Sequence, residues 1–276
     1  MTRRIALSLF AAPFALQSEN RPRLPGTLEL RSRSRKDGIA LDKNLYWKSS
    51  ETAIIICDMW NNHYCKSAVR RIEAMIPSMN STIAAARKLG VQIIHAPSGT
   101  MDVYEATPQR RRMKEARAAR PPVPIAKWCY LDPNAEAPLP VDDVTESCDD
   151  AVVGERVRAF NREHPGLEIT GFDGISDSGE EIYNFFEQES IRNVVLMGVH
   201  TNMCVLGRPF GIRQLTRLGK NVVLARDLTD AMYDPRQAPW VSHERGTELI
   251  LQHVERYWCP TIPGADLTHL SARQAS

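Results

Sequence analysis

The chain has 276 residues, which is enough for one or two domains with a full hydrophobic core. Its 43% hydrophobic and 25% charged residues are ordinary for a globular protein and exclude a collagen-like, coiled-coil or wholly disordered chain. The net charge is +2, but the first 36 residues hold eight basic and two acidic side chains (+6), so the remainder carries −4. Because nucleic-acid binding needs clustered basic side chains, this weakly acidic body predicts no nucleic-acid partner.

The extreme N-terminus has the order of a secretory signal. Two arginines precede an apolar stretch from Ile5 to Leu16, and polar residues follow. We therefore expect a signal peptide over residues 1–18 and export to the periplasm or secretion, with a cytoplasmic location as the alternative. No apolar run reaches the ~18 residues needed to cross a bilayer, so no membrane span is predicted. Residues 19–50, rich in Arg, Pro and Ser, are expected to form an extended arm.

From Thr52 the chain alternates strand-like and helix-like segments. Continuous apolar runs predict buried strands, and apolar residues at spacings of three and four predict helices between them. Strands joined by single helices form βαβ units, so the sequence predicts an α/β domain around a parallel sheet. The expected strands are 53–57, 91–95, 193–198 and 221–225, and the expected helices are 68–89, 179–188 and 204–218.

Between Ser98 and Pro165 this alternation stops. Six of the 18 prolines lie within residues 121–140, and a basic run occupies residues 110–120. We interpret residues 98–165 as an insertion with one helix, and the basic run as a solvated helix face.

Six cysteines stand at positions 57, 65, 129, 148, 204 and 259. Neither a CxxC pair nor an HExxH motif is present, so no structural zinc site is predicted. In an exported protein Cys129 could pair with Cys148, and Cys65 with Cys259. Both pairs could equally be free thiols in a reducing compartment.

Three strand ends carry candidate chemistry, because ligands of open parallel sheets bind beyond the carboxyl ends of the strands. These are Asp58, His95 and the segment 198–204. Cys204 lies where a strand passes into a helix, and the positive end of that helix is expected to lower the pKa of its thiol. Backbone N–H groups near Thr201 and Cys204 are expected to hold an oxyanion.

The strand ending in Asp58, the segment Gly-Val-His-Thr-Asn-Met-Cys-Val and a downstream strand ending near Asp227 resemble the isochorismatase-like cysteine hydrolases, which include nicotinamidases and related amidases. The resemblance covers about residues 52–259. It implies a hydrolase domain over residues 51–262, with a three-layer, doubly wound, mostly parallel six-stranded sheet. It also implies a homo-oligomer.

The same resemblance implies a catalytic set of Asp, Lys and Cys. Cys204 would be the nucleophile and Asp58 the base, with a cis peptide bond between Val199 and His200. The family lysine is missing, because the strand expected to carry it, residues 167–173, contains none. Lys127, in the insertion, is the candidate replacement.

Five further residues are predicted to bind substrate at this edge of the sheet. Trp60 and His63 replace the glutamine and the aromatic residue that the family usually has after its aspartate. Nicotinamidases hold a metal through an Asp and two His, but their Asp-x-His segment is absent here. We therefore predict no cofactor, with a divalent metal such as zinc as the alternative. The predicted substrate-binding residues are Trp60, His63, His95, His200 and Thr201.

The sequence thus predicts a cysteine-dependent hydrolase that cleaves a small amide or related carbonyl compound through a thioester. Because the family lysine is missing, the alternative is a non-catalytic binding or assembly protein on the same fold. A weaker alternative is thiol redox chemistry between Cys57 and Cys204.

Overall fold

The computed structural model describes residues 21–142 and 147–271, and its strands form one eight-stranded sheet in the order β2-β1-β8-β7-β6-β3-β4-β5. The expected signal peptide lies outside the described residues. The strands are β1 (Thr27–Lys36), β2 (Ile39–Lys48), β3 (Thr52–Cys57), β4 (Gln92–Ala96), β5 (Gly174–Ile175), β6 (Asn193–Val199), β7 (Asn221–Asp230) and β8 (Thr261–Ile262).

The six strands from β8 to β5 run parallel to one another, which confirms the predicted six-stranded parallel core. All residues of β3 and β6 are buried, as the continuous apolar runs predict for strands covered on both faces. The helices are α1 (Lys66–Lys88), α2 (Pro108–Lys114), α3 (Gly179–Glu189), α4 (Cys204–Gly207), α5 (Ile212–Arg217) and α6 (His243–Tyr257), with short 3-10 turns η1 (Ser49–Glu51), η2 (Met101–Tyr104) and η3 (Gly264–Leu267).

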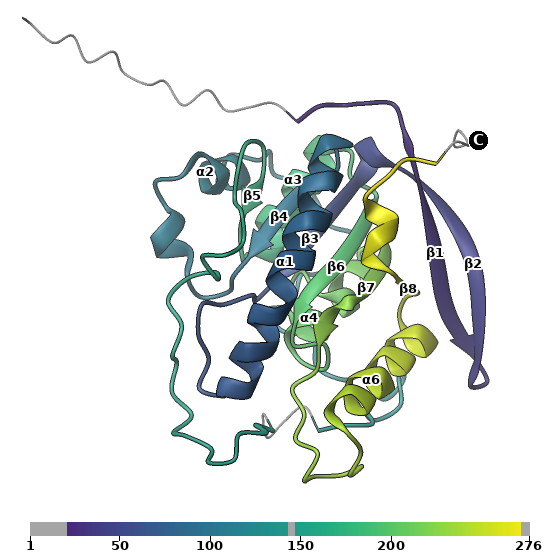
Figure 1. Cartoon of the computed structure of the whole chain (residues 1–276). Helices are drawn as coiled ribbons and strands as arrows, with labels where there is room; N and C mark the ends of the chain where they lie inside the picture. Colours follow the sequence, from purple (N-terminus) through teal and green to yellow (C-terminus); the bar gives the residue numbers. More distant parts are fainter. Residues whose placement is uncertain (1–20, 143–146, 272–276) are drawn as a thin grey trace, which may run out of the picture.

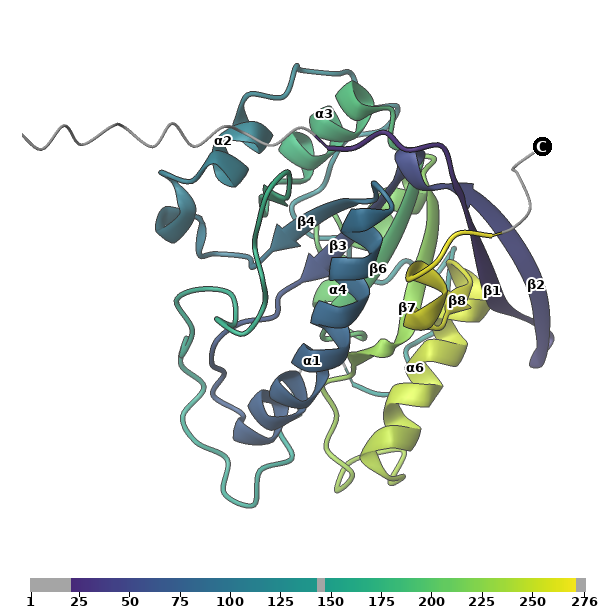
Figure 2. The ribbon, with the colours of Figure 1, turned by 45° about the horizontal axis from the view of Figure 1, so that its top comes forward.

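Helices cover both faces of the sheet and give the doubly wound, three-layer arrangement. Figures 1 and 2 show α1 lying across β3 and β6. The apolar face of α1 packs with η3 on one side, and α3, α4, α5 and α6 form a second apolar cluster on the other. The parallel core starts at β3, winds outward to β4 and β5, and then returns to β6 and β7. The winding direction therefore switches between β3 and β6, where open sheets of this kind place their ligand sites.

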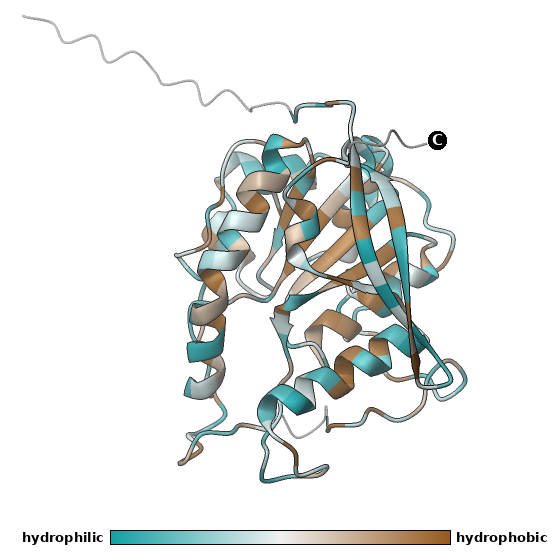
Figure 3. Cartoon of the chain, turned by 45° about the vertical axis from the view of Figure 1, so that its right-hand side comes forward, coloured by the Kyte–Doolittle hydropathy of each residue, from teal (hydrophilic) through white to brown (hydrophobic). Residues whose placement is uncertain are grey.

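The segment expected to be an extended arm is a β-hairpin that enlarges the sheet to eight strands. β1 pairs with β2 over ten residues and continues onto β8, in antiparallel orientation in both cases. Asp37 and Gly38 have φ values of 52° and 81°, which suit a two-residue hairpin turn. Arg33 and Arg35 donate to Glu255 of α6 at 2.7 and 2.8 Å. Figure 3 shows the hydrophobic and hydrophilic residues alternating along the hairpin.

The single helix expected over 204–218 is wrong, because the chain breaks into α4 and α5. Pro209 lies two residues after the end of α4, and proline lacks the N–H that a continuing helix needs. Insertion 98–165 contains the one helix predicted for it, α2, within its described part. Within the described ranges, no helix combines the length and apolarity that crossing a bilayer requires.

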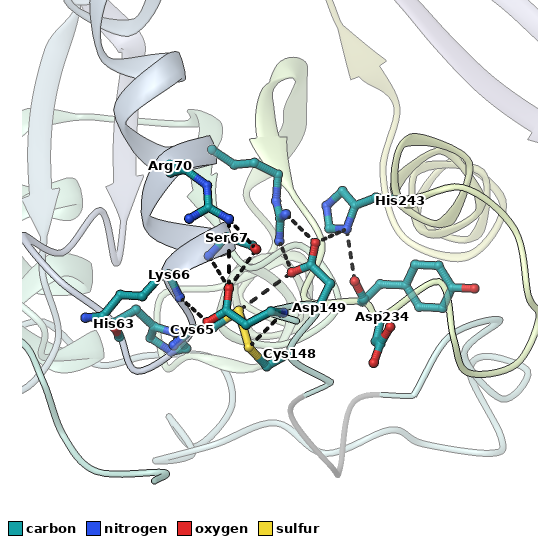
Figure 4. The surroundings of a disulfide bond; sticks show 12 residues. His63, Cys65, Lys66, Ser67, Arg70, Cys148, Asp149, Asp234 and His243 are labelled. Atoms are coloured by element: carbon teal, nitrogen blue, oxygen red, sulfur yellow. Dashed lines mark hydrogen bonds and ion pairs between the residues drawn. A yellow bond between two sulfur atoms is a disulfide. The ribbon is translucent and has the colours of Figure 1, made fainter. Parts of the chain in front are cut away.

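The cysteine pairing also differs from both expected pairs. Cys65 and Cys148 form a disulfide with a Cα–Cα distance of 5.5 Å, while Cys129 and Cys259 are separate, buried thiols. Cys259 packs in the core, and the Cys129 thiol contacts Gln214 Oε1 at 3.4 Å. Figure 4 shows the disulfide at the start of α1, where it joins this helix to the insertion.

The segment after Cys148 supplies the N-terminal cap of α1. The helix has no side-chain cap of its own, but Asp150 accepts hydrogen bonds from the backbone N–H groups of Lys66 and Ser67 at 2.7 Å each. A carboxylate at this end satisfies unpaired N–H groups and interacts favourably with the helix dipole. Asp149 pairs with Arg71 one turn further along, at 2.7 Å. The disulfide and these carboxylates therefore fix the insertion beside the helix.

Candidate active site

Asp58 and Cys204 meet at the switch point of the sheet. Asp58 follows β3 directly, and Cys204 begins α4 after the loop that leaves β6. These two strands are parallel neighbours, with Cys57 opposite Gly198. Gly198 has φ of 106°, and a Cβ atom there would overlap the Cys57 carbonyl oxygen, so only glycine lets the cysteine loop come this close to β3. The Val199–His200 peptide bond is cis, as the resemblance implied.

The Asp58 carboxylate is fully buried and is held from two directions. One oxygen accepts a hydrogen bond from the Ser98 backbone N–H, and the other accepts one from Arg208 Nε, each at 2.8 Å. Cys204 lies close enough to Asp58 for this carboxylate to raise the pKa of the thiol. The predicted nucleophile and base are therefore neighbours, as proton transfer between them requires.

Arg208 is the functional residue that the sequence analysis missed. It follows Cys204 by four residues, one helical turn, so its side chain lies on the same side of α4 as the thiol. Its guanidinium lies over the Trp128 ring, 5.4 Å from the centroid. Burial alone would lower the pKa of Arg208, but the Asp58 charge outweighs it and raises that pKa, so the side chain stays charged. A permanent cation thus lies beside Asp58 and Cys204.

The expectation of a low thiol pKa is wrong for the resting protein. Burial is the largest cause that raises the pKa of Cys204, and the charge and hydrogen bond of Asp58 raise it further. Arg208 and the backbone N–H of His200 lower it, but not enough. Helix α4 has only four residues, so its dipole is weak. At neutral pH the resting sulfur is therefore a protonated thiol that must give its proton away before it can attack.

A cavity of about 400 Å³ opens beside the Cys204 sulfur. Of the predicted substrate-binding residues, Trp60, His63 and His200 line it. Trp60 is fixed by a hydrogen bond to the Ser98 carbonyl oxygen at 3.1 Å and stacks on Phe160 at 4.1 Å between ring centroids. The full lining is Trp60, His63, Tyr64, Trp128, Arg156, Val157, Arg158, Phe160, His200, Met203, Cys204, Arg208 and Met232.

Both histidines of the cavity are neutral. Burial lowers the pKa of His63 to about 4, helped by the charge of Lys66. Burial likewise lowers the pKa of His200 to about 3, and His63 adds to the effect. Their rings lie edge to face with centroids 5.5 Å apart. They therefore offer the cavity uncharged imidazoles.

His95 does not belong to this cavity, which corrects its predicted role in substrate binding. It is fully buried, with Nδ1 2.8 Å from Glu163 and Nε2 3.4 Å from Asp173. Arg87 completes the group, 2.8 Å from Asp173. The three histidines therefore do not gather as one set of metal ligands. The cluster with metal-ligand spacing in the described part of the chain is Cys65, Cys148 and Asp150, whose sulfur atoms are joined as a disulfide.

Thr201 and Lys127 are likewise outside the cavity. The Thr201 N–H donates to the Asp230 carbonyl oxygen at 2.9 Å, and its hydroxyl contacts Thr229 at 2.7 Å, so neither group is available to a substrate or an oxyanion. Lys127 is exposed and lines a neighbouring pocket with Ser98 and Arg208. Arg208, and not Lys127, is the cation that pairs with Asp58 and lines the cavity with Cys204.

The buried His95 group predicts a loss of stability in alkali. Burial alone would lower the pKa of His95, but the Glu163 and Asp173 carboxylates raise it to about 9. The folded state thus favours the imidazolium, and this stabilisation is complete below about pH 6.5 and lost as the pH rises through about 9. We expect the free energy of unfolding to fall by about 3 kcal/mol between pH 7 and pH 10.

Urea unfolding at a series of pH values measures this change, with His95→Asn as the comparison. The variant is expected to be less stable at pH 7 and to show a flatter dependence above pH 8, because it has no proton to lose. Parallel curves for the two proteins would contradict a protonated His95.

A family profile identifies the chain. Residues 52–243 match the sequence profile of the Isochorismatase domain. Comparison with curated protein sequences finds no match. Among solved structures, similar chains include a cysteine hydrolase from Pseudomonas syringae, with 14% identity, 80% of this chain and 92% of that one covered, and a TM-score of 0.48. An isochorismatase from Pseudomonas putida has 13% identity, coverage of 79% and 91%, and a TM-score of 0.48.

A nicotinamidase from Staphylococcus aureus is more distant, with 11% identity, coverage of 75% and 94%, and a TM-score of 0.30. The profile match spans more than half of the chain and includes both Asp58 and Cys204. The chain therefore belongs to the isochorismatase-like family of cysteine hydrolases.

Proposed function

We propose that the protein hydrolyses a small amide or related carbonyl compound through a thioester on Cys204. The observation that carries this proposal is the Cys204 thiol at the wall of a cavity of small-molecule size, next to a buried Asp58 whose carboxylate accepts from Arg208 at 2.8 Å. A nucleophile, a base and a fixed cation close together are the arrangement that covalent acyl transfer needs.

The reaction begins when Asp58 takes the proton of the Cys204 thiol and the sulfur attacks the carbonyl carbon. The carbonyl oxygen becomes an oxyanion, which we assign to the backbone N–H of Cys204 because that of Thr201 is already bonded. The C–N bond then breaks, and Asp58 returns its proton to the leaving amine. Asp58 next takes a proton from water, whose oxygen attacks the thioester; the C–S bond breaks, the acid is released, and the proton passes from Asp58 to the sulfur of Cys204.

Arg208 acts on this cycle through its charge alone. An arginine does not lose its proton in proteins, so it holds the Asp58 carboxylate in place and stabilises the thiolate and the anionic transition state. A lysine could in addition give up a proton, which Arg208 cannot do. The proton transfers of the cycle are therefore assigned to Asp58.

A screen of small amides, nicotinamide included, tests the proposal by following ammonia or amine release. We expect turnover of at least one compound by the native protein, no turnover by Cys204→Ala, and unchanged turnover by Cys129→Ala, which removes a buried thiol outside the cavity. Intact-mass measurement during turnover is expected to show the acyl group on the protein. Turnover that survives in Cys204→Ala would contradict the mechanism, whereas tight binding without any turnover would favour the non-catalytic alternative.

A further inference from the structure

The cavity beside Cys204 carries unbalanced positive charge. Arg156, Arg158 and Arg208 line it, and its lining contains no Asp or Glu. Arg208 is paired with the buried Asp58, so its charge is compensated. Arg156 and Arg158 form no ion pair with any described residue. Two uncompensated cations therefore face the space where the substrate carbonyl must lie.

Arg158 is held in position without being neutralised. Its guanidinium donates a hydrogen bond to the Gly99 carbonyl oxygen and lies over the Phe160 ring, 5.0 Å from the centroid. Phe160 in turn stacks on Trp60. These contacts fix the direction of the side chain but leave its charge free to attract an anion. Positioned arginines bind carboxylates through paired, charge-assisted hydrogen bonds.

The segment that carries these arginines is anchored to the catalytic edge of the sheet. The Asn61 N–H donates to the Arg162 carbonyl oxygen at 3.0 Å, and the His164 N–H donates to that of Met59 at 2.7 Å. Glu163 is bound to the buried His95. The residues that follow the two arginines are thus tied to the residues around Asp58, and the segment they belong to forms one wall of the cavity.

We propose that this cavity selects an amide substrate that carries a carboxylate, which Arg156 and Arg158 bind while Cys204 attacks the amide carbonyl. The aromatic rings of Trp60, Phe160 and Trp128 suit a flat, apolar frame between the two ends of such a molecule. The neutral His63 and His200 add no charge that would oppose an anion. This inference rests on the proposed function for the cleaved bond, but anion recognition is testable without cleavage.

Turnover is compared between two aryl amides that differ by one carboxylate, benzamide and 4-carbamoylbenzoate. We expect kcat/KM to be about 10- to 100-fold higher for the acid, the range given by hydrogen bonds to a charged group. Arg156→Gln and Arg158→Gln are each expected to reduce the ratio of the two kcat/KM values about tenfold. The reduction should come from a lower kcat/KM for 4-carbamoylbenzoate, with that for benzamide unchanged. Arg162→Gln, an exposed arginine of the same segment outside the cavity, is the matched control and should leave the ratio unchanged.

Binding to Cys204→Ala keeps the inference testable if neither amide is cleaved. Calorimetry is expected to show benzoate binding at least tenfold tighter than benzamide, and this preference should vanish when Arg156→Gln and Arg158→Gln are added together. A preference for benzoate that depends on the two arginines, seen without any turnover, would support the anion site and contradict the proposed function. Equal binding of the two compounds, no binding of either, tighter binding of phenyl phosphate than of benzoate, or an unchanged preference in the arginine variant would each overturn the inference.

Discussion

Asp58→Asn is expected to lower kcat about 10³-fold while the protein stays folded. The asparagine keeps the shape of the side chain and can still accept from the Ser98 N–H, but it cannot take a proton from the Cys204 thiol. General-base groups contribute roughly 10²- to 10⁴-fold to rate. Steady-state turnover of the amide found by the screen measures this loss, and circular dichroism checks the fold.

The same variant is expected to react faster with iodoacetamide than the native protein at neutral pH. The negative charge and hydrogen bond of Asp58 both raise the pKa of Cys204, so removing them lowers it and increases the thiolate fraction. Slower turnover together with faster alkylation would identify Asp58 as the base and not as a merely structural residue. Asp177→Asn is the matched control, because its carboxylate accepts from Gly99 N–H nearby. Activity of Asp58→Asn within tenfold of native would refute Asp58 as the base.

Arg208→Met is expected to lower kcat by about 10² to 10³, and Arg208→Lys is expected to stay within about tenfold of native. Methionine removes the cation that stabilises the thiolate and leaves the buried Asp58 charge without a partner. Breaking a buried pair in this way costs about 3 kcal/mol or more of folding stability. Lysine restores the charge but with a single point donor in place of the guanidinium.

Thiol reactivity distinguishes this effect from a general loss of packing. Arg208 lowers the pKa of Cys204, so Arg208→Met should alkylate more slowly than native, opposite in sign to Asp58→Asn. Lys127→Met is the control and should change neither kcat nor labelling, because Lys127 is exposed in the neighbouring pocket. Loss of activity in Lys127→Met with retention in Arg208→Met would reverse the assignment of the catalytic cation.

The parallel core and the Asp58–Cys204 pair could be predicted because their signals are local. A buried parallel strand is a continuous apolar run, and residues that end neighbouring strands meet at one edge of the sheet. Arg208 does not stand out in the sequence, because the family resemblance points to a lysine on another strand. The spacing of one helical turn from Cys204 was visible in the sequence and could have indicated it.

Other features depend on contacts between distant residues. The Cys65–Cys148 bond joins positions 83 residues apart, and connectivity of this kind cannot be deduced from spacing alone. The thiol pKa depends on burial and on the neighbouring carboxylate, whereas the sequence showed only the start of a helix. The β1–β2 hairpin did have a local signal, the Asp37–Gly38 turn, but the Arg, Pro and Ser residues of this segment favour its interpretation as an extended arm.

The hairpin also bears on how this protein can be shortened. The profile match begins at residue 52, after β2, and ends at residue 243, before most of α6 and all of β8. Leu28, Leu30 and Trp47 of the hairpin are buried in the same apolar cluster as the central strands. Burial of each such side chain contributes roughly 1.5–3 kcal/mol to stability, and the whole free energy of unfolding of a typical protein is about 5–15 kcal/mol. Expression boundaries drawn from the profile would cut through the core, whereas boundaries at residues 21 and 271 keep it whole.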